Sequence, residues 1–299
     1  MVEDVLITEA GGDPAAGYED RSTLDLVELM NEQDASVASA VAAAAPAIAA
    51  AVDAVADRLR AGGRLVYVGA GSSGHIAALD ASECEATFST PTGLVVALVA
   101  GGGSSSALAQ AAAEDDSEAG AADVAGLRVA AADAVVGISA SGSTPYVVGA
   151  LEAAAAAGAL TACIVSSSGS RLGSLVEHEI AVVVGPEFLA GSTRLKAGTA
   201  QKLVLNTIST VAMIRLGKTY GNLMVDVVAA NEKLEGRVRR IVATATGASA
   251  AEVDAALADA NGDARVAIVS LAAGVDAETA AQRLDASGRS IARALENAS

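Results

Sequence analysis

Small hydroxyls, glycines and carboxylates gather in one stretch of the sequence, where a short apolar run ends in a turn. Residues 69–74 of that turn read Gly-Ala-Gly-Ser-Ser-Gly and lead directly into a helical pattern. A turn of this kind directs backbone N–H groups and hydroxyls toward an anion at the start of a helix. The helical pattern then carries Asp80 and Glu83, which share one helix face. The stretch predicts a phosphate cradle with a carboxylate nearby.

A second hydroxyl-rich segment, residues 139–144, directly precedes Pro145. Proline is favoured at the first position of a helix, and hydroxyls there satisfy open N–H groups. Such a segment could bind a phosphate without Lys or Arg, or it could be a plain helix cap. The candidate phosphate ligands from the two segments are Ser72, Ser73, Ser139, Ser141, Ser143 and Thr144.

Residues 69–74 also match the G-x-G-x-x-G pattern of dinucleotide sites. A dinucleotide site requires an acidic residue at the end of the second strand. In this sequence the second apolar run, residues 94–99, continues into Ala100 and three glycines. A small phosphorylated metabolite is therefore favoured over a dinucleotide, and a turn that serves packing alone remains the alternative.

Two carboxylates, Glu83 and Glu114, lie in mainly small and apolar helical patterns that follow strands. Partial burial raises the pKa of a carboxyl group and suits it to general acid or base catalysis. The alternative is that both are solvated helix residues. His75, at the mouth of the first turn, could contact a ligand or lie on the surface. The two histidines are isolated and no Cys/His spacing fits a metal, so no metal site is expected.

The elements that must position these residues alternate between short apolar runs and helical patterns. Continuous apolar runs separated by helices predict an α/β fold with a parallel sheet covered on both faces. Three of the runs end in Ser/Gly loops, which predicts a binding edge at the carboxyl ends of the strands. The expected strands are residues 64–68, 94–99, 134–138, 161–165 and 180–184, and the helices between them are 72–86, 104–120 and 145–157.

The flanking segments read as helices on either side of this sheet. A helix over 24–31 and an Ala-rich helix over 35–61, with a kink near Pro46, precede the first strand. A long helix over 197–217 follows the last strand. Capping residues Ser249, Asp263 and Asp276 then predict several short helices. The expected division is an N-terminal arm and helix (1–34), a domain that holds the sheet and the candidate phosphate site (35–240) and a small helical domain (241–299).

The amino-acid composition limits the classes of partner that the protein can bind. Asp and Glu number 36 against 19 Lys and Arg, a net charge of −17, which argues against nucleic acid and anionic membranes. The two cysteines predict no disulfide framework. The N-terminus lacks the pattern of a signal peptide, and the most apolar long segment, 37–56, is broken by Pro46 and Asp53. We expect a soluble cytoplasmic protein.

Five blocks carry a family resemblance. Three are residues 69–74, Leu-Asp-Ala-Ser-Glu-Cys at 79–84 and Ala-Ser-Gly-Ser-Thr-Pro-Tyr at 140–146. The longest are Lys-Ala-Gly-Thr-Ala-Gln-Lys-Leu-Val-Leu-Asn at 196–206 and Gly-Asn-Leu-Met-Val-Asp-Val-Val at 221–228. Together they resemble the N-acetylmuramic acid 6-phosphate etherase family, from about residue 7 to the C-terminal helices.

The resemblance implies a sugar isomerase (SIS) fold, a three-layer sandwich with a five-stranded parallel sheet, in a homodimer whose subunits help form each other's sites. It implies cleavage of the D-lactyl ether of N-acetylmuramate 6-phosphate without a metal or redox cofactor. On the matching positions Glu83 would remove the C2 proton and assist lactate departure, and Glu114 would handle the water added back. The Ser/Thr loops would hold the phosphate, with Gly71, His75 and Lys196 as further substrate contacts.

The sequence departs from the family pattern close to this site. His75 and Ser143 stand where the family usually has Arg, and Glu85-Ala86 replace two prolines. Loss of two guanidinium groups removes bidentate anion recognition. A non-catalytic sugar-phosphate sensor and an aldose–ketose isomerase on the same fold are therefore the alternative functions.

Overall fold

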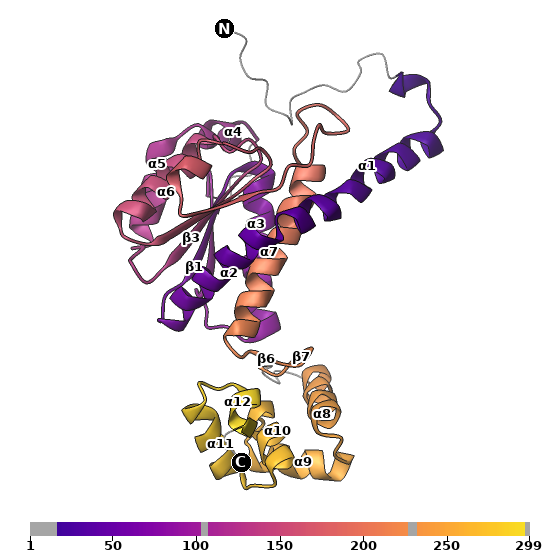
Figure 1. Ribbon diagram of the computed structural model, residues 1–299, viewed down its shortest axis with the longest axis vertical. Helices are drawn as coiled ribbons and strands as arrows, with labels where there is room; N and C mark the ends of the chain where they lie inside the picture. Colours follow the sequence, from indigo (N-terminus) through magenta and orange to yellow (C-terminus); the bar gives the residue numbers. More distant parts are fainter. Residues whose placement is uncertain (1–16, 103–106, 227–231, 297–299) are drawn as a thin grey trace. The chain divides into compact units, whose positions relative to one another are not determined.

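Five strands form the centre of the computed structural model, which describes residues 17–102, 107–226 and 232–296 (Figure 1). All five are parallel, in the order β2-β1-β3-β4-β5. Their bounds are β1 (Leu65–Gly69), β2 (Val95–Val99), β3 (Ala134–Ser139), β4 (Leu160–Val165) and β5 (His178–Ala181). Every residue of β1, β3 and β4 is buried, as expected for apolar strands covered on both faces.

The expected five-stranded parallel sheet is confirmed, but its last strand lies earlier than the predicted 180–184. Strand β5 pairs with β4 from Ala162 opposite His178 to Val165 opposite Ala181. Val165 is the last residue of β4, and the pairing ends with the hydrogen bond from Val182 N to its oxygen at 2.8 Å. Apolar character alone therefore placed this strand a few residues too late.

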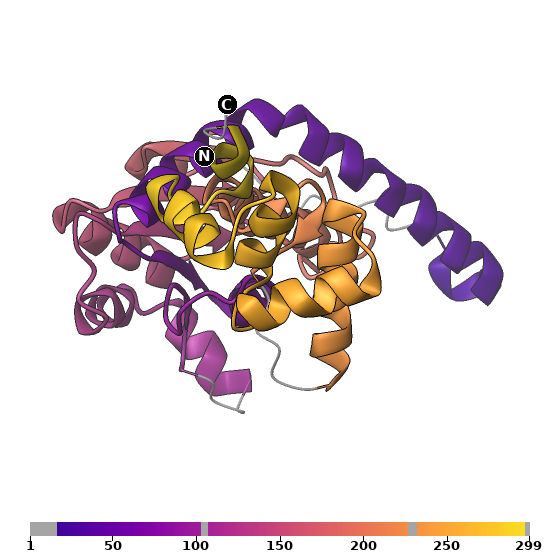
Figure 2. The same cartoon turned by 90° about the horizontal axis from the view of Figure 1, so that it is seen from below.

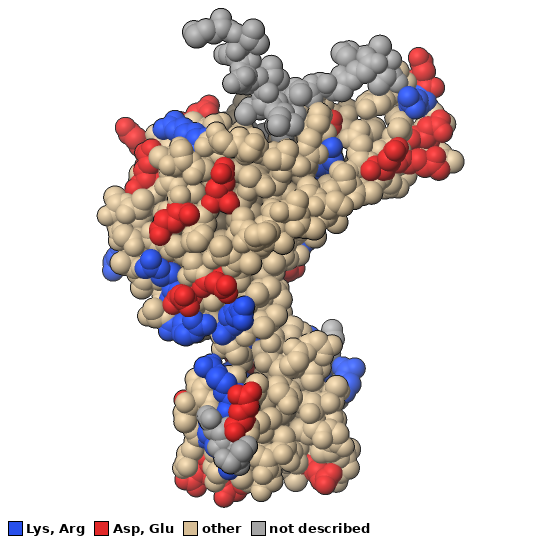
Figure 3. Space-filling view, viewed as in Figure 1, with Lys and Arg blue, Asp and Glu red and all other residues tan. Residues whose placement is uncertain are grey.

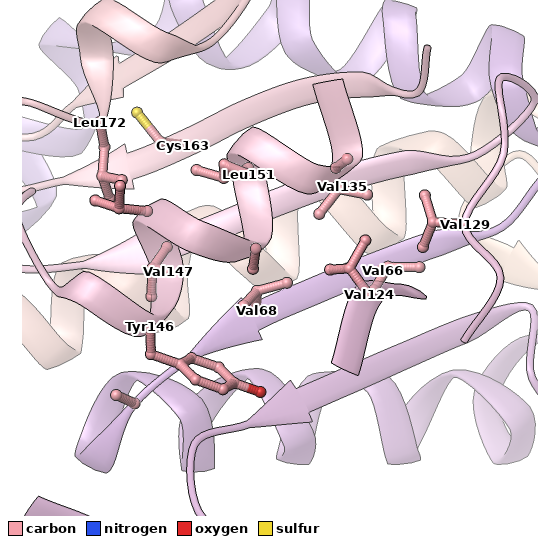
Figure 4. Close-up of a cluster of buried hydrophobic side chains, with 14 of the residues drawn as sticks. Val66, Val68, Val124, Val129, Val135, Tyr146, Val147, Leu151, Cys163 and Leu172 are labelled. Carbon is pink, nitrogen blue, oxygen red and sulfur yellow. The ribbon is translucent and has the colours of Figure 1, made fainter. Parts of the chain in front are cut away.

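Helices cover both faces of the sheet, which confirms the three-layer α/β expectation. On one face α6 (Pro145–Ala156) packs against β1, β3 and β4, and α5 (Ser117–Gly126) packs against α6. Figure 4 shows the side chains that meet there, including Val66 and Val135 from strands and Leu151 from α6. On the opposite face α2 (Ala45–Arg60) packs against β3, β4 and β5.

Two further helices are tied to β1 by a buried carboxylate. Asp80, on α3 (Gly71–Phe88), is 6% exposed. The Tyr67 hydroxyl of β1 donates to its Oδ2 at 3.0 Å, and the Ser209 hydroxyl of α7 (Lys196–Arg215) donates to its Oδ1 at 3.1 Å. These bonds satisfy a carboxylate that burial would otherwise penalise. Asp80 therefore fastens α3 and α7 to the sheet.

The N-terminal helices differ from the sequence expectation in their lengths. A single helix, α1 (Thr23–Ala43), replaces the predicted helices over 24–31 and the start of 35–61 because residues 32–34 contain no helix breaker. The kink expected near Pro46 is confirmed, since α2 begins at Ala45 with a bend of 58° from α1. Most of α1 extends away from the sheet in both views (Figures 1 and 2). A short 3-10 helix, η1 (Tyr18–Asp20), precedes it.

Among the described residues no single helix is long and apolar enough to cross a membrane. The pair of α1 and α2 reaches that length and composition only when the two are counted together across their bend.

The predicted helix over 104–120 is in fact two helices. They are α4 (Ala107–Glu114) and α5, separated at residues 115 and 116, and residues 103–106 lie outside the described part. The Asp116 carboxylate accepts a hydrogen bond from Ala119 N at 2.9 Å and so caps α5. The break leaves Glu114 at the very end of α4.

The described chain forms two compact units: residues up to Ser82 with Gly93–Thr210, and Glu83–Thr92 with residues from Val211 on. The domain boundaries expected at 34/35 and 240/241 fall inside α1 and inside α8 (Glu232–Thr246). The short helix η2 (Gly173–Leu175) belongs to the first unit.

The second unit has a core of its own, built around Val242, Ile268 and Leu284. Its capping residues were predicted correctly. Ser249 forms a capping box, and the Asp263 and Asp276 carboxylates accept first-turn N–H groups. Besides α8 it contains β6 (Thr219–Tyr220), β7 (Leu223–Met224), α9 (Ala250–Asp259), α10 (Ala264–Ala273), α11 (Ala277–Ala286) and α12 (Ile291–Glu296).

Candidate functional site

A cavity of about 380 Å³ opens in the first unit where β1 and β3 end. The strand order places this point where the chain reverses its direction across the sheet, between β1 and β3. Such a switch point is where open α/β sheets bind their ligands. The cavity is lined by Ala70, Gly71, Ser72, Ser73, Glu114, Ile138, Ser139, Ala140, Ser141, Thr144, Gly191 and Thr193.

One wall is the turn from β1 into α3. Gly71 adopts a positive φ of 52°, a conformation that glycine enters at little cost. This turn lets α3 begin directly at the end of the strand, so that Ser72 and Ser73 form its first turn. First-turn N–H groups have no partner within a helix, and they carry the positive end of its dipole. The wall therefore offers hydroxyl and N–H donors to the cavity.

The facing wall is a network of hydroxyls between β3 and α6. Ser139 Oγ lies 2.8 Å from Thr144 Oγ1 and 3.3 Å from Ser141 Oγ, which lies 3.0 Å from Ser143 Oγ. Backbone Gly142 N also donates to Ser139 Oγ at 3.1 Å. Thr144 precedes α6 and makes no side-chain cap bond to it. The hydroxyls thus hydrogen-bond to one another, and each can rotate to donate a hydrogen bond to a ligand instead.

The third Ser/Gly loop supports this wall. Ser167 Oγ, after β4, donates to the backbone oxygen of Ser141 at 3.0 Å. No residue of that loop is among those that line the cavity. Of the three loops predicted to form a binding edge, the first two therefore line the cavity, and the third packs behind the second.

Glu114 brings a carboxyl group into this cavity from the end of α4. A Cβ placed on Gly71 would lie 2.6 Å from Glu114 Oε1, so the carboxyl group sits against the α3 turn. Burial, with a smaller contribution from neighbouring Asp115, raises the pKa of Glu114 above its usual value. A carboxyl group with a raised pKa can donate or accept a proton nearer neutral pH. The position of Glu114 in the cavity and its raised pKa are therefore compatible with acid–base chemistry.

Four of the residues singled out from the sequence lie elsewhere than the cavity lining. His75 is exposed on α3, and Ser143 is exposed and reaches the cavity through Ser141. Lys196 is 6% exposed and begins α7, with its N–H bound to Glu187. Glu83 is exposed on α3 and belongs to the second unit. No cationic side chain is among the residues that line the cavity.

A loop missed from the sequence completes the lining. Gly191 and Thr193 come from the connection between β5 and α7. The run Gly191-Ser192-Thr193 has the same small and hydroxylated character as the other walls. Its position after a strand could have signalled its role. No group of three metal-ligating side chains occurs in the part of the chain that the structure describes.

Residues 21–155 match the family model of the glucokinase regulatory protein N-terminal SIS domain. Over 292 residues the chain is 54% identical to the N-acetylmuramic acid 6-phosphate etherase of Streptomyces avermitilis, with 98% of this chain and 94% of the relative covered. It is 55% identical to that of Rubrobacter xylanophilus, with 94% and 93% covered. The chain belongs to the N-acetylmuramic acid 6-phosphate etherase family.

A solved structure agrees with the fold of this etherase-family chain. The phosphoheptose isomerase of Francisella tularensis superposes with a TM-score of 0.52 at 22% identity. The match covers 65% of this chain and 100% of the isomerase. At this identity the likeness shows the SIS fold and leaves the reaction to the site itself.

Proposed function

We propose that the chain is a carbon–oxygen lyase that cleaves the D-lactyl ether of N-acetylmuramate 6-phosphate, giving N-acetylglucosamine 6-phosphate and D-lactate. One observation carries the proposal: the cavity joins an acid–base carboxyl group, Glu114, to two donor-rich walls suited to a phosphate. The etherase relatives, which match over almost the whole chain, supply the substrate class.

The 6-phosphate is held by hydroxyls and N–H groups. Neutral donors at a helix start can bind a phosphate because their geometry is fixed and the helix dipole favours the anion. In this assignment the backbone at Gly71 contacts the ligand, and His75 and Lys196 supply further substrate contacts. The phosphate ligands are Ser72, Ser73, Ser139, Ser141, Ser143 and Thr144.

The reaction is an elimination followed by addition of water. Glu83 removes the C2 proton of the open-chain sugar, the C3–O bond to lactate breaks, and the departing oxygen receives a proton. Water then adds to C3 of the unsaturated sugar, with Glu114 taking its proton and C2 regaining one. Overall, the ether and one water molecule give the sugar alcohol at C3 and lactate, with no net oxidation or reduction. Donors near the developing enolate would stabilise its charge.

The remaining assignments concern the assembly. Glu83 is exposed in the single chain, so a second chain can meet it. We place the protein in a homodimer in which each subunit helps to form the partner's site, and in the cytoplasm. The functional parts would be an arm and helix (1–34), a sugar-phosphate domain (35–240) and a small helical domain (241–299).

The decisive assay is enzymatic detection of D-lactate from N-acetylmuramate 6-phosphate. Glu83→Gln should abolish both lactate release and exchange of the C2 proton with deuterated water. Glu114→Gln should lower turnover by roughly 10²- to 10⁴-fold, as for loss of an acid–base group, while C2 exchange persists. The matched controls Glu85→Gln and Glu118→Gln change exposed carboxylates nearby and should stay active. If the folded, unaltered chain releases no lactate, the proposal is wrong.

A further inference from the structure

The loop that carries Gly191 and Thr193 into the cavity is hydrogen-bonded to the first turn of α7 from two points along its length. The Glu187 carboxylate, 2% exposed, accepts hydrogen bonds from Lys196 N at 2.9 Å and Ala197 N at 3.0 Å. Gly198 N also donates to the Thr193 oxygen at 2.9 Å. Glu187, near the middle of the loop, and Thr193, near its end, are therefore both fixed to the first turn of α7.

The residue after Glu187 makes a further contact, with the segment before α1. Phe188 stacks on Tyr18 of η1, with ring centroids 4.7 Å apart and planes within 2° of parallel. The whole chain contains only four Tyr, two Phe and no Trp, so few pairs of residues in it could form an aromatic stack. Stacked aromatic pairs contribute beyond their buried area. The pair joins the segment before α1 to the wall of the cavity.

The contact contributes little to the core. The helix η1 contains no buried residue, and both rings are only partly buried. Loss of the Tyr18 ring would therefore leave the sheet and its covering helices intact. Its effect would fall on the loop: the Glu187 bonds remain, but the Phe188 ring, directly before Leu189 and the turn that presents Gly191, loses its stacking partner.

From this geometry we infer that Tyr18 is a positioning residue for the cavity: by stacking on Phe188 it holds the loop between β5 and α7 so that Gly191 and Thr193 contact the bound sugar phosphate. The inference rests on the proposed function for its substrate. In this inference, backbone and hydroxyl groups of this wall contact a part of the ligand that does not react. They therefore support the bound substrate and the transition state equally.

Kinetics of Tyr18→Ala test this role. The KM for N-acetylmuramate 6-phosphate should rise by roughly two- to tenfold, the range that an aromatic pair accounts for, while kcat and the thermal midpoint stay unchanged. Tyr18→Phe keeps the ring and should restore the KM. The control Leu189→Ala alters an exposed side chain of the same loop and should leave the KM unchanged.

A double-variant cycle tests whether the two rings act through each other. The KM of Tyr18→Ala/Phe188→Ala should equal that of the worse single variant, because the second change removes nothing further. Effects that multiply, or a Tyr18→Ala protein with an unchanged KM, would overturn the inference.

A fluorescence measurement separates this inference from the proposed function. Phe188→Trp introduces the sole tryptophan of the chain at the stacked position. Titration with inorganic phosphate should change its emission, and adding Tyr18→Ala should shift the starting spectrum and weaken the titration. Identical spectra and titrations with and without Tyr18→Ala contradict the inference. Absence of lactate from the unaltered chain contradicts only the proposed function.

Discussion

Glu114 and Gly71 share a contact that leaves no room for a side chain between them. Gly71→Ala would place a Cβ 2.6 Å from Glu114 Oε1, so the flexible carboxyl end must move. Turnover should fall by roughly 10²-fold, the order expected when a catalytic group is displaced by about 1 Å. Stability should fall by only about 1 kcal/mol, from the positive φ. Steady-state kinetics and thermal unfolding measure the two effects.

The control for this substitution is Gly221→Ala. Gly221 has a φ of 55°, close to the 52° of Gly71, and nothing lies within 4 Å of its missing Cβ. It should lose comparable stability and keep full activity. Equal activity losses in the two variants would mean that backbone strain, and not displacement of Glu114, explains the result.

The raised pKa of Glu114 predicts a pH dependence. Asp115 raises that pKa by its negative charge, so Asp115→Asn should lower it, although burial continues to raise it. Because the basic form of Glu114 then persists to lower pH, the acid limb of the kcat/KM profile should move to lower pH. Glu118→Gln, an exposed control, should leave the limb in place. An acid limb that moves upward, or does not move with Asp115→Asn, contradicts the role of Glu114.

Single residues were predictable where local pattern determined their placement. Ser72, Ser139 and Thr144 lie at or a few residues after the ends of β1 and β3, so their arrival at one cavity could be predicted. The exposure of His75 depends on the rotation of α3 about its axis, which tertiary bonds such as those of Asp80 determine. The spacing of residues in the sequence alone does not determine that rotation.

At the scale of elements, α5 and α6 connect the two sides of the cavity. Glu114 ends the helix before α5, and Thr144 immediately precedes α6. The helices approach so closely that a Cβ on Gly149 would lie 2.0 Å from the Ser117 oxygen. The Tyr146 hydroxyl donates to Asp123 Oδ2 at 2.6 Å across the same contact.

Gly149→Ala should therefore destabilise the fold by about 2 kcal/mol, since backbone on both sides resists the added methyl group. Denaturant unfolding measures the change. Gly126→Ala, at the end of α5 with nothing within 4 Å, should be neutral or stabilising by a few tenths of a kcal/mol through helix propensity. A fully stable Gly149→Ala protein contradicts the close approach of these helices.

Element types were easier to predict than their ends. Buried apolar runs determined the strands, because no exposed face competes in a parallel sheet. The division of α4 from α5 depends on the cap at Asp116. Asp116 lies in a run of acidic residues, so its position in the sequence does not identify it as the capping residue. The loop carrying Gly191 and Thr193 reaches the cavity only through long-range anchoring, which local pattern does not encode.

For the whole molecule, the excess of acidic side chains opposes an anionic substrate. The net charge is −17, and acidic groups gather along the extended end of α1 (Figure 3). Chloride salts screen this repulsion, so KM should fall a few-fold between roughly 10 mM and 150 mM ionic strength. Steady-state kinetics at a fixed pH measures it. A KM that rises with salt would show that long-range attraction, and not local donors, recruits the substrate.

The measurement closest to the central claim follows the oxygen of water into the products. N-acetylmuramate 6-phosphate is turned over in ¹⁸O-labelled, deuterated water, and both products are analysed by mass spectrometry and NMR. Elimination and water addition predict ¹⁸O at C3 and deuterium at C2 of N-acetylglucosamine 6-phosphate, with no ¹⁸O from bond cleavage in D-lactate. Solvent ¹⁸O in the lactate hydroxyl, with the sugar oxygen retained, would contradict the account.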